Sequence, residues 1–323
     1  MKHNLKITLV LLGMFLLTQF IGLYVVNHYS TTKIVQGESF NVSAPSLPYG
    51  METPAVTEET DYLSFFYSLL IAFVLAISLL FLLTHFNARF IIRLWFLLVV
   101  TLSLGIAINS FISFRYASIV ALGIALSLAI IKIYRQNFLV HNLTELLIYP
   151  GIAAVFVPIL NLKTMIILLI IISIYDMWAV WKSGIMQKMA KYQIQKLNIF
   201  SGFFVPYASK KVKEKIKLLQ QKYKAKKISK KNMVKQKIKV NIAILGGGDV
   251  VFPILTSGVM LKTYGFTTLL GITLPWASIF VIIGAMLGLF SLFLFSEKKK
   301  FYPAMPFITI GIFLGMIINW FLI

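Results

Sequence analysis

The sequence predicts an all-α, polytopic membrane protein with nine transmembrane helices. Of its 323 residues, 59% are hydrophobic and only 13% are charged, and the mean hydropathy is +0.86. Soluble domains carry about a quarter charged residues, so this composition excludes a soluble globular protein. The apolar residues also gather in runs of about 20, the length that a helix needs to cross a hydrocarbon core about 30 Å thick.

Nine such runs follow one another along the chain. The predicted spans are 7–26, 63–84, 90–108, 117–133, 138–160, 164–181, 240–261, 268–295 and 301–323. Lys2 and Lys6 precede the first run, as they would in a signal peptide, but no small-residue cleavage site follows it. We therefore expect a retained first helix.

Positive charge is concentrated in one segment between the sixth and seventh spans. Lys and Arg total 31 against 10 Asp and Glu, a net charge of +21, and 18 of the 27 lysines lie in residues 182–239. Because cytoplasmic loops carry excess Lys and Arg, we expect this loop and the N-terminus to be cytoplasmic and the C-terminus to be outside. The predicted organisation is helices one to six in 1–181 with an outer loop at 27–62, the basic loop, and helices seven to nine in 240–323.

The composition also limits the partners and cofactors. A basic loop beside a membrane attracts anionic lipid head groups, so we expect lipid contact there and no nucleic-acid binding. Its first part, 192–204, carries enough aromatic and apolar residues for an amphipathic interfacial helix. The absence of cysteine excludes disulfides and Cys-ligated metals, and four scattered histidines predict no metal site and no cofactor. A cysteine-free, lysine-rich chain fits a prokaryotic cell membrane.

Two of the three aspartates lie inside apolar sequence. Asp176 precedes Lys182 by six residues, which places it roughly 9 Å below the end of its helix. Asp249 follows Lys239 by ten residues, or about 15 Å if that stretch is fully helical. An ionisable group at membrane depth is costly and indicates function. Two neighbouring carboxyls at a similar depth would share a proton, so that one acts as general base on water and the other as general acid.

Two further elements lie near these aspartates. Gly246, Gly247 and Gly248 precede Asp249 and would let a helix or an extended peptide approach the backbone closely. The last predicted span opens with Phe301-Tyr302-Pro303-Ala304-Met305-Pro306, whose two prolines favour an extended start. Glycine packing and proline at a helix start are also common structural features, and the position of both elements in one leaflet with the aspartates favours a functional role.

These elements together resemble the presenilin and signal peptide peptidase family of intramembrane aspartyl proteases. Tyr175-Asp176 matches the tyrosine–aspartate motif of its sixth span, Gly246-Gly247-Gly248-Asp249 the glycine-x-glycine-aspartate motif of its seventh, and Pro303-Ala304-Met305 the proline-alanine-leucine of its ninth. Met305 stands where the family has Leu, a change that nearly conserves volume and polarity. The resemblance covers essentially the whole chain and is typical of a prokaryotic, archaeal homologue.

The resemblance implies a presenilin-like fold and an aspartic endopeptidase that cuts the transmembrane helices of other membrane proteins. Asp176 and Asp249 would be the catalytic pair. Tyr175, Gly246, Gly248, Pro303, Ala304 and Met305 would shape the site and bind substrate. A cytoplasmic loop between spans six and seven is similar to the presenilin orientation, which implies substrates whose N-terminus is outside. The chain carries no evident partner-docking domain, which is compatible with a single subunit or a homo-oligomer.

Other functions could use the same residues. A proton- or ion-coupled transporter could use the intramembrane acids, including Glu145 with His141 and Asn142 on one face of the fifth span. A structural hydrogen-bonded pair near the cytoplasmic end of that span explains those residues better, and Glu145 is not expected in the catalytic pair. Prepilin peptidases share a glycine-x-glycine-aspartate pattern but leave the Pro303 element unexplained. Serine and metal-dependent intramembrane proteases are excluded because the sequence lacks GxS with a partnered histidine in a span and lacks HExxH.

Overall fold

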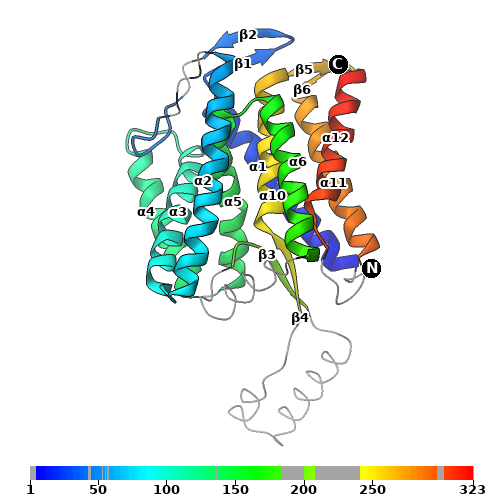
Figure 1. The fold of residues 1–323 in the computed structure, drawn as a ribbon. Coiled ribbons are helices and arrows are strands. Elements are labelled where there is room, and N and C mark those ends of the chain that lie inside the picture. Colours follow the sequence, from blue (N-terminus) through cyan, green and yellow to red (C-terminus); the bar gives the residue numbers. More distant parts are fainter. Residues whose placement is uncertain are drawn as a thin grey trace, which may run out of the picture.

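A computed structural model gives one helical bundle (Figure 1). It describes residues 5–42, 45–52, 54, 56, 58–135, 137–182, 200–207, 241–296 and 302–322. Within these ranges, eight helices are long and apolar enough to cross a membrane, and a further 18-residue helix, α10 (Gly247–Tyr264), lies among them. Each of the nine predicted spans therefore contains one helix, and the protein is an integral, multi-pass membrane protein.

The first part of the chain forms six of these helices and a hairpin. In order these are α1 (Leu5–His28), β1 (Thr32–Val35), β2 (Glu38–Asn41), α2 (Glu59–His85), α3 (Arg89–Asn109), α4 (Ala117–Tyr134), α5 (Phe138–Phe156) and α6 (Leu162–Met177). A 3-10 turn, η1 (Val157–Ile159), ends α5, and a π-helical turn, η2 (Trp178–Lys182), continues α6. Two of these helices begin with asparagine, a residue type favoured at the N-cap. The side chains of Asn137 and Asn161 accept backbone N–H groups at the starts of α5 and α6.

The second part holds two hairpins and three helices. They are β3 (Gly202–Tyr207), β4 (Asn241–Gly246), α10, β5 (Thr267–Leu269), β6 (Ile272–Leu274), α11 (Trp276–Phe295) and α12 (Met305–Leu322). The three two-stranded sheets are all antiparallel. The expected interfacial helix over 192–204 is wrong in its last part, since Gly202–Phe204 belong to β3. Predictions for 183–199 and 208–240 lie outside the described residues.

Two predicted spans begin later than the hydropathy indicates. The seventh was expected to be helical from residue 240, but 241–246 form β4 and the helix starts at Gly247. The depth derived for Asp249 from a continuous helix is therefore wrong, because an extended strand rises about twice as far per residue. The eighth was expected from 268, where β5 and β6 lie instead. A short apolar run does not by itself distinguish a strand from a helix. Pairing with a segment distant in the chain determines which of the two forms.

Helix α10 lies in the interior of the bundle and contacts α1, α5, α6 and α11. Every residue from Pro253 to Leu261 is buried. Its glycines, Asp249 and Lys262 make it less apolar than the other helices, and a helix surrounded by protein does not need a lipid-facing surface. The first turn of α10, which carries Asp249, directly follows β4 in the chain.

The two ends of the bundle carry different hairpins (Figure 1). The N-terminus and the β3–β4 hairpin lie at one end, called here the β3–β4 end. The β1–β2 and β5–β6 hairpins and the C-terminus lie at the other. Because α6 runs towards the β3–β4 end and α10 and α12 run away from it, the end of α6 and the starts of α10 and α12 come together there.

Candidate active site

Asp176 lies in the last turn of α6 and is buried. Its Oδ2 accepts the backbone N–H of Met305 at 3.0 Å, and the N–H of Ala304 also donates to this carboxyl. The first N–H groups of a helix have no partner within the helix, so the start of α12 provides donors for a carboxylate. A second contact between the two helices joins the hydroxyls of Ser173 and Thr309 at 2.8 Å.

The Pro303–Met305 element is thus brought into direct contact with one predicted catalytic aspartate. Pro303, Ala304 and Met305 are all buried. Pro303 lies just before α12, whereas Pro306 is already the second residue of that helix and needs no N–H donor there. The N–H groups of Ala304 and Met305 at this start have no preceding turn to bond to and point at Asp176 instead. The structure therefore gives this predicted segment a specific contact through its backbone.

Asp249 is the third residue of α10 and is partly buried. Gly246 is the N-cap of this helix, and its backbone N–H donates to the Asp249 carboxyl. An acid at the third helical position that bonds back to the N-cap fixes the first turn. The two predicted catalytic carboxyls come from different helices, α6 and α10, which are in contact, and the charge of Asp176 reaches Asp249.

The three glycines before Asp249 are not equivalent. A Cβ on Gly247 would lie 2.7 Å from the Tyr149 hydroxyl and 2.8 Å from the Ser201 hydroxyl. A Cβ on Gly248 would meet only a ring carbon of Phe252, at 3.9 Å. Gly247 therefore carries the tight packing, although it occupies the variable position of the glycine-x-glycine-aspartate motif. Gly248 is exposed beside Asp249 and leaves its backbone open to approach.

This difference predicts opposite effects of two matched substitutions. Gly247→Ala should lower the free energy of unfolding by about 1–3 kcal/mol, because buried Tyr149 must move to admit the methyl group. Gly248→Ala should leave stability equal or slightly higher and should raise the KM for a substrate that approaches this backbone. Unfolding in detergent micelles and initial rates against substrate concentration measure both. Equal stability of Gly247→Ala and wild type would contradict the packing argument.

Tyr175 points away from the aspartate that follows it. Its ring is 37% exposed and lies near the rings of Phe73 on α2 and Trp178, with centroids 6.3 Å apart in each pair. It lines an apolar cavity of about 480 Å³ between α2, α5, α6 and α10, which also contacts Val251 and Phe252 just after Asp249. Tyr175 is thus part of the wall of an apolar cavity that also borders the first part of α10.

A buried polar group that the sequence indicated only in part lies beside this site. His141, Asn142 and Glu145 share one face of α5 as expected, and all three are buried. The sequence did not associate Lys132 of α4 with them, yet its Nζ lies 2.5 Å from the Glu145 Oε1. Tyr149, one turn beyond Glu145, was also missed. Tyr149 could have been predicted, because it follows Glu145 by four residues and so lies on the same face of α5. Lys132 could not, because only the packing of α4 against α5 brings it to Glu145.

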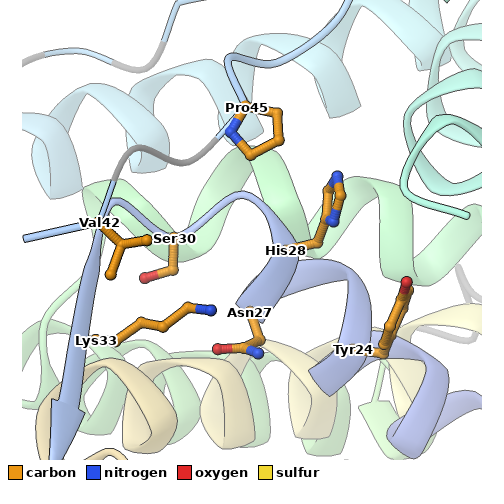
Figure 2. Close-up of a pocket in the computed structure, with 7 residues that line it drawn as sticks. All are labelled: Tyr24, Asn27, His28, Ser30, Lys33, Val42 and Pro45. Atoms are coloured by element: carbon orange, nitrogen blue, oxygen red, sulfur yellow. The ribbon is translucent and has the colours of Figure 1, made fainter. Parts of the chain in front are cut away.

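A polar pocket at the other end of the bundle is a poorer candidate. Figure 2 shows Lys33 of β1 extending across it towards Asn27 of α1, with His28 and Ser30 at its sides. Its volume is about 240 Å³. The described residues that line it include no carboxyl group, and it lies far from the ends of α6 and α10 that carry the aspartates (Figure 1). It offers no acid–base pair for peptide hydrolysis.

Comparison with known proteins agrees with this fold. No curated protein matches the sequence. Two crystal forms of a presenilin family intramembrane aspartate protease match in fold, each with a TM-score of 0.57. They are 17% and 16% identical to this chain, and the matches cover 98% of it and 99% and 98% of theirs. The family model "Signal-peptide peptidase, presenilin aspartyl protease" matches residues 33–323. The chain belongs to the signal-peptide peptidase and presenilin family of aspartyl proteases.

Proposed function

We propose that this protein is an intramembrane aspartic endopeptidase that hydrolyses peptide bonds within transmembrane helices, with Asp176 and Asp249 as its catalytic pair. The observation that carries the proposal is that both carboxyls lie at the junction of α6, α10 and the start of α12, near enough for the charge of Asp176 to act on Asp249. Family membership supports the reaction class, and the buried backbone contacts support fixed positions for both acids.

The two carboxyls would share one proton. The ionised carboxyl takes a proton from water as the water oxygen attacks the scissile carbonyl carbon, and the protonated one donates to the carbonyl oxygen. The tetrahedral intermediate then collapses, the C–N bond breaks, and the amide nitrogen leaves with a proton from the pair. As the C–N bond breaks, a hydroxyl of the tetrahedral intermediate returns its proton to the pair and becomes the carbonyl of the carboxylic acid product, so the pair ends the cycle with its single shared proton.

A substrate helix would reach the aspartates from the side of α2. Only Phe66 of α2 is buried, so this helix is loosely packed against the rest of the bundle. The cavity beside Tyr175 is enclosed by side chains of α2, α5, α6 and α10, whereas a spanning helix with its side chains is about 10 Å wide. Entry of a whole helix therefore requires α2 to move outward.

The scissile segment would bind in extended form beside β4. One edge of β3 is occupied by Asn142, which bonds to both the N–H and the C=O of Phe204, and the other edge pairs with β4. Among the described strands, β4 pairs only with β3, and none of them covers its outer edge, where a substrate strand leading to Asp249 would add. Strand addition provides backbone hydrogen bonds without demanding one side-chain sequence.

This binding mode predicts a dependence on substrate helicity. A spanning peptide must release its i→i−4 hydrogen bonds before a strand can form, which is costly in lipid. A Gly or Pro near the cut site should therefore raise the cleavage rate roughly tenfold over a uniform Leu/Ala span, since about 1 to 3 kcal/mol of helix stability is lost. Rates for a matched peptide pair in lipid vesicles measure it, and equal rates would refute it.

The experiment that tests the function itself is cleavage of a fluorescently tagged single-span peptide by purified protein in vesicles without any ion gradient. Cleavage at a defined bond within the span supports a protease. Gradient-driven movement of protons or ions with no cleavage would instead favour a transporter. The ion pair between Lys132 and Glu145 counts against the transporter, because Glu145 is committed to a neighbouring cation.

We also propose that the β3–β4 end faces the cytoplasm in a prokaryotic cell membrane, with anionic lipids against the basic residues of 182–239. Because the chain contains no cysteine, single cysteines can report the orientation directly. A cysteine at Ser201 should react with an impermeant maleimide only in inverted vesicles. A cysteine at Leu270, which is 94% exposed in the β5–β6 turn, should react only in right-side-out vesicles.

A further inference from the structure

A buried ionic cluster lies at the β3–β4 end between α4 and α5. The Lys132 Nζ donates to the Glu145 Oε1 at 2.5 Å and lies 3.2 Å from the His141 Nδ1. All three residues are at most 7% exposed. Burying charged groups at this depth costs free energy unless they are well paired. The cluster is therefore expected to have a role other than packing.

The cluster determines which nitrogen of His141 carries the proton. An ammonium group has no acceptor, so the Lys132 Nζ must donate and the Nδ1 of His141 must accept. The proton of the neutral ring then lies on Nε2. That nitrogen is 2.8 Å from the carbonyl oxygen of Gly202, which can only accept, and 3.6 Å from the Glu145 Oε1, too far for a hydrogen bond. Lys132 thus leaves the ring proton of neutral His141 on Nε2, which donates it to the carbonyl oxygen of Gly202.

His141 and its neighbour together hold β3 along α5. His141 binds the carbonyl of Gly202. Asn142 donates to the carbonyl of Phe204 at 2.9 Å and accepts its N–H at 3.1 Å. These three bonds occupy backbone groups that a third strand would otherwise bind. The side chains of α5 therefore fix the position of β3 along its length and limit how far the hairpin can shift.

From β3 the contacts continue to Asp249. Gly202 lies opposite Gly246 in the β3–β4 pairing. Gly246 lies directly against the Asp249 carboxyl: a Cβ on Gly246 would be 3.1 Å from the Asp249 Oδ2, and its N–H faces that carboxyl. Gly202 has φ +131°, and a Cβ there would collide with the carbonyl oxygen of Leu245, so only glycine permits this close pairing. A continuous series of direct contacts thus joins the cluster to the carboxyl.

A second contact leads to the same helical turn. Tyr149 lies one turn after Glu145 on α5, and its buried hydroxyl lies beside Glu145 and Ser201. This hydroxyl makes no hydrogen bond of good geometry within the described residues, and it packs where a side chain of residue 247 would be. The start of α10 therefore rests on α5 both through the hairpin and directly.

We propose that Lys132, His141 and Glu145 are positioning residues that hold the β3–β4 hairpin, and through it Asp249, in the geometry needed opposite Asp176. This rests on the proposed function, because it concerns the placement of one member of the proposed pair. None of the three touches the reacting atoms. They act through Gly202 and Gly246, and their loss should change the rate of the chemical step rather than substrate binding.

The test compares His141→Leu with His141→Gln. Glutamine can still accept from Lys132 and donate to Gly202, whereas leucine can do neither. We expect kcat for the tagged single-span peptide to fall at least about tenfold in His141→Leu with KM within about twofold of wild type, because misplaced catalytic groups slow chemistry steeply. His141→Gln should recover most of the loss. His85→Leu, at the exposed end of α2, is the matched control and should keep wild-type kcat.

A distance measurement separates positioning from a general loss of stability. With no native cysteine, spin labels can be attached at Ile167 of α6 and Ile244 of β4, each about two-fifths exposed. The distance distribution between the labels should broaden or shift in His141→Leu and return towards wild type in His141→Gln. If His141→Leu does not fold, Asn142→Ala is the substitute, because it removes only the two hydrogen bonds to the backbone of Phe204. It should change kcat and the label distance in the same direction but by less.

The outcomes are distinct. An unchanged kcat in His141→Leu, or a lost kcat with an unchanged label distance, would overturn the positioning role. Loss of kcat in glutamine and leucine variants alike would also overturn it, since the predicted hydrogen bonds are kept in one of them. The proposed function fails separately, if Asp176→Asn and Asp249→Asn cut the same peptide at the wild-type rate.

Discussion

Replacing either intramembrane aspartate with asparagine should reduce the rate of cleavage at least about a thousandfold. Each carboxyl is expected to transfer protons in the rate-determining steps, and an amide can neither take a proton from water nor donate one as an acid. Because the two act as a unit, the double variant should be little worse than either single one. The measurement is kcat for the tagged single-span peptide in vesicles.

The asparagine variants are also expected to fold. In Asp176→Asn the new amide oxygen can still accept the N–H of Met305, and in Asp249→Asn it can still accept the N–H of Gly246. The third aspartate of the chain supplies the control, because Asp61→Asn keeps an acceptor for the Glu58 N–H at the start of α2 and should cut at the wild-type rate. Cleavage that survives in both intramembrane variants would assign the activity to another group or another protein.

Removing the buried cation should have the largest effect on stability. Lys132→Met leaves Glu145 with no opposite charge in a site where it is fully buried. Breaking one side of a buried pair typically lowers the free energy of unfolding by about 3–5 kcal/mol. The double variant Lys132→Met/Glu145→Leu removes both charges and should recover most of that loss. Equilibrium unfolding in detergent micelles measures all three proteins.

An exposed ion pair provides the comparison. Lys163 and Glu59 are paired at 3.1 Å with both side chains 76% exposed, so Lys163→Met should change stability by at most about 1 kcal/mol. If Lys132→Met were as mild, the buried pair would be structurally dispensable. The double variant should also regain stability without regaining kcat, because His141 would still lack the donor that sets its protonated nitrogen.

The helical spans could be predicted because they depend on local composition. A run of about 20 apolar residues has one stable solution in lipid, a helix that satisfies its own backbone groups. The family resemblance followed from three short motifs, and the family model confirms it. The position of Asp176 near the end of its helix depended only on that run and is confirmed by α6.

The β3–β4 hairpin could not be predicted in this way. The residues of β4 are almost wholly apolar and continue directly into α10, so hydropathy reads them as one span. What makes them a strand is pairing with β3, and β3 in turn bonds to Asn142, 62 residues earlier. The sequence also marked Gly246 and Gly248 as the glycines of the motif, whereas the tightest contact is at Gly247.

The sequence by itself determined which residues lie in the membrane, which acids are buried there and which family the motifs resemble, because each depends on a short stretch of chain. Only the tertiary structure decided that Ala304 and Met305 donate to Asp176, that Lys132 meets His141 and Glu145, and that α5 supports the hairpin before Asp249. Those contacts join residues far apart in the chain. They form only when packed helices bring buried polar groups close enough to satisfy one another.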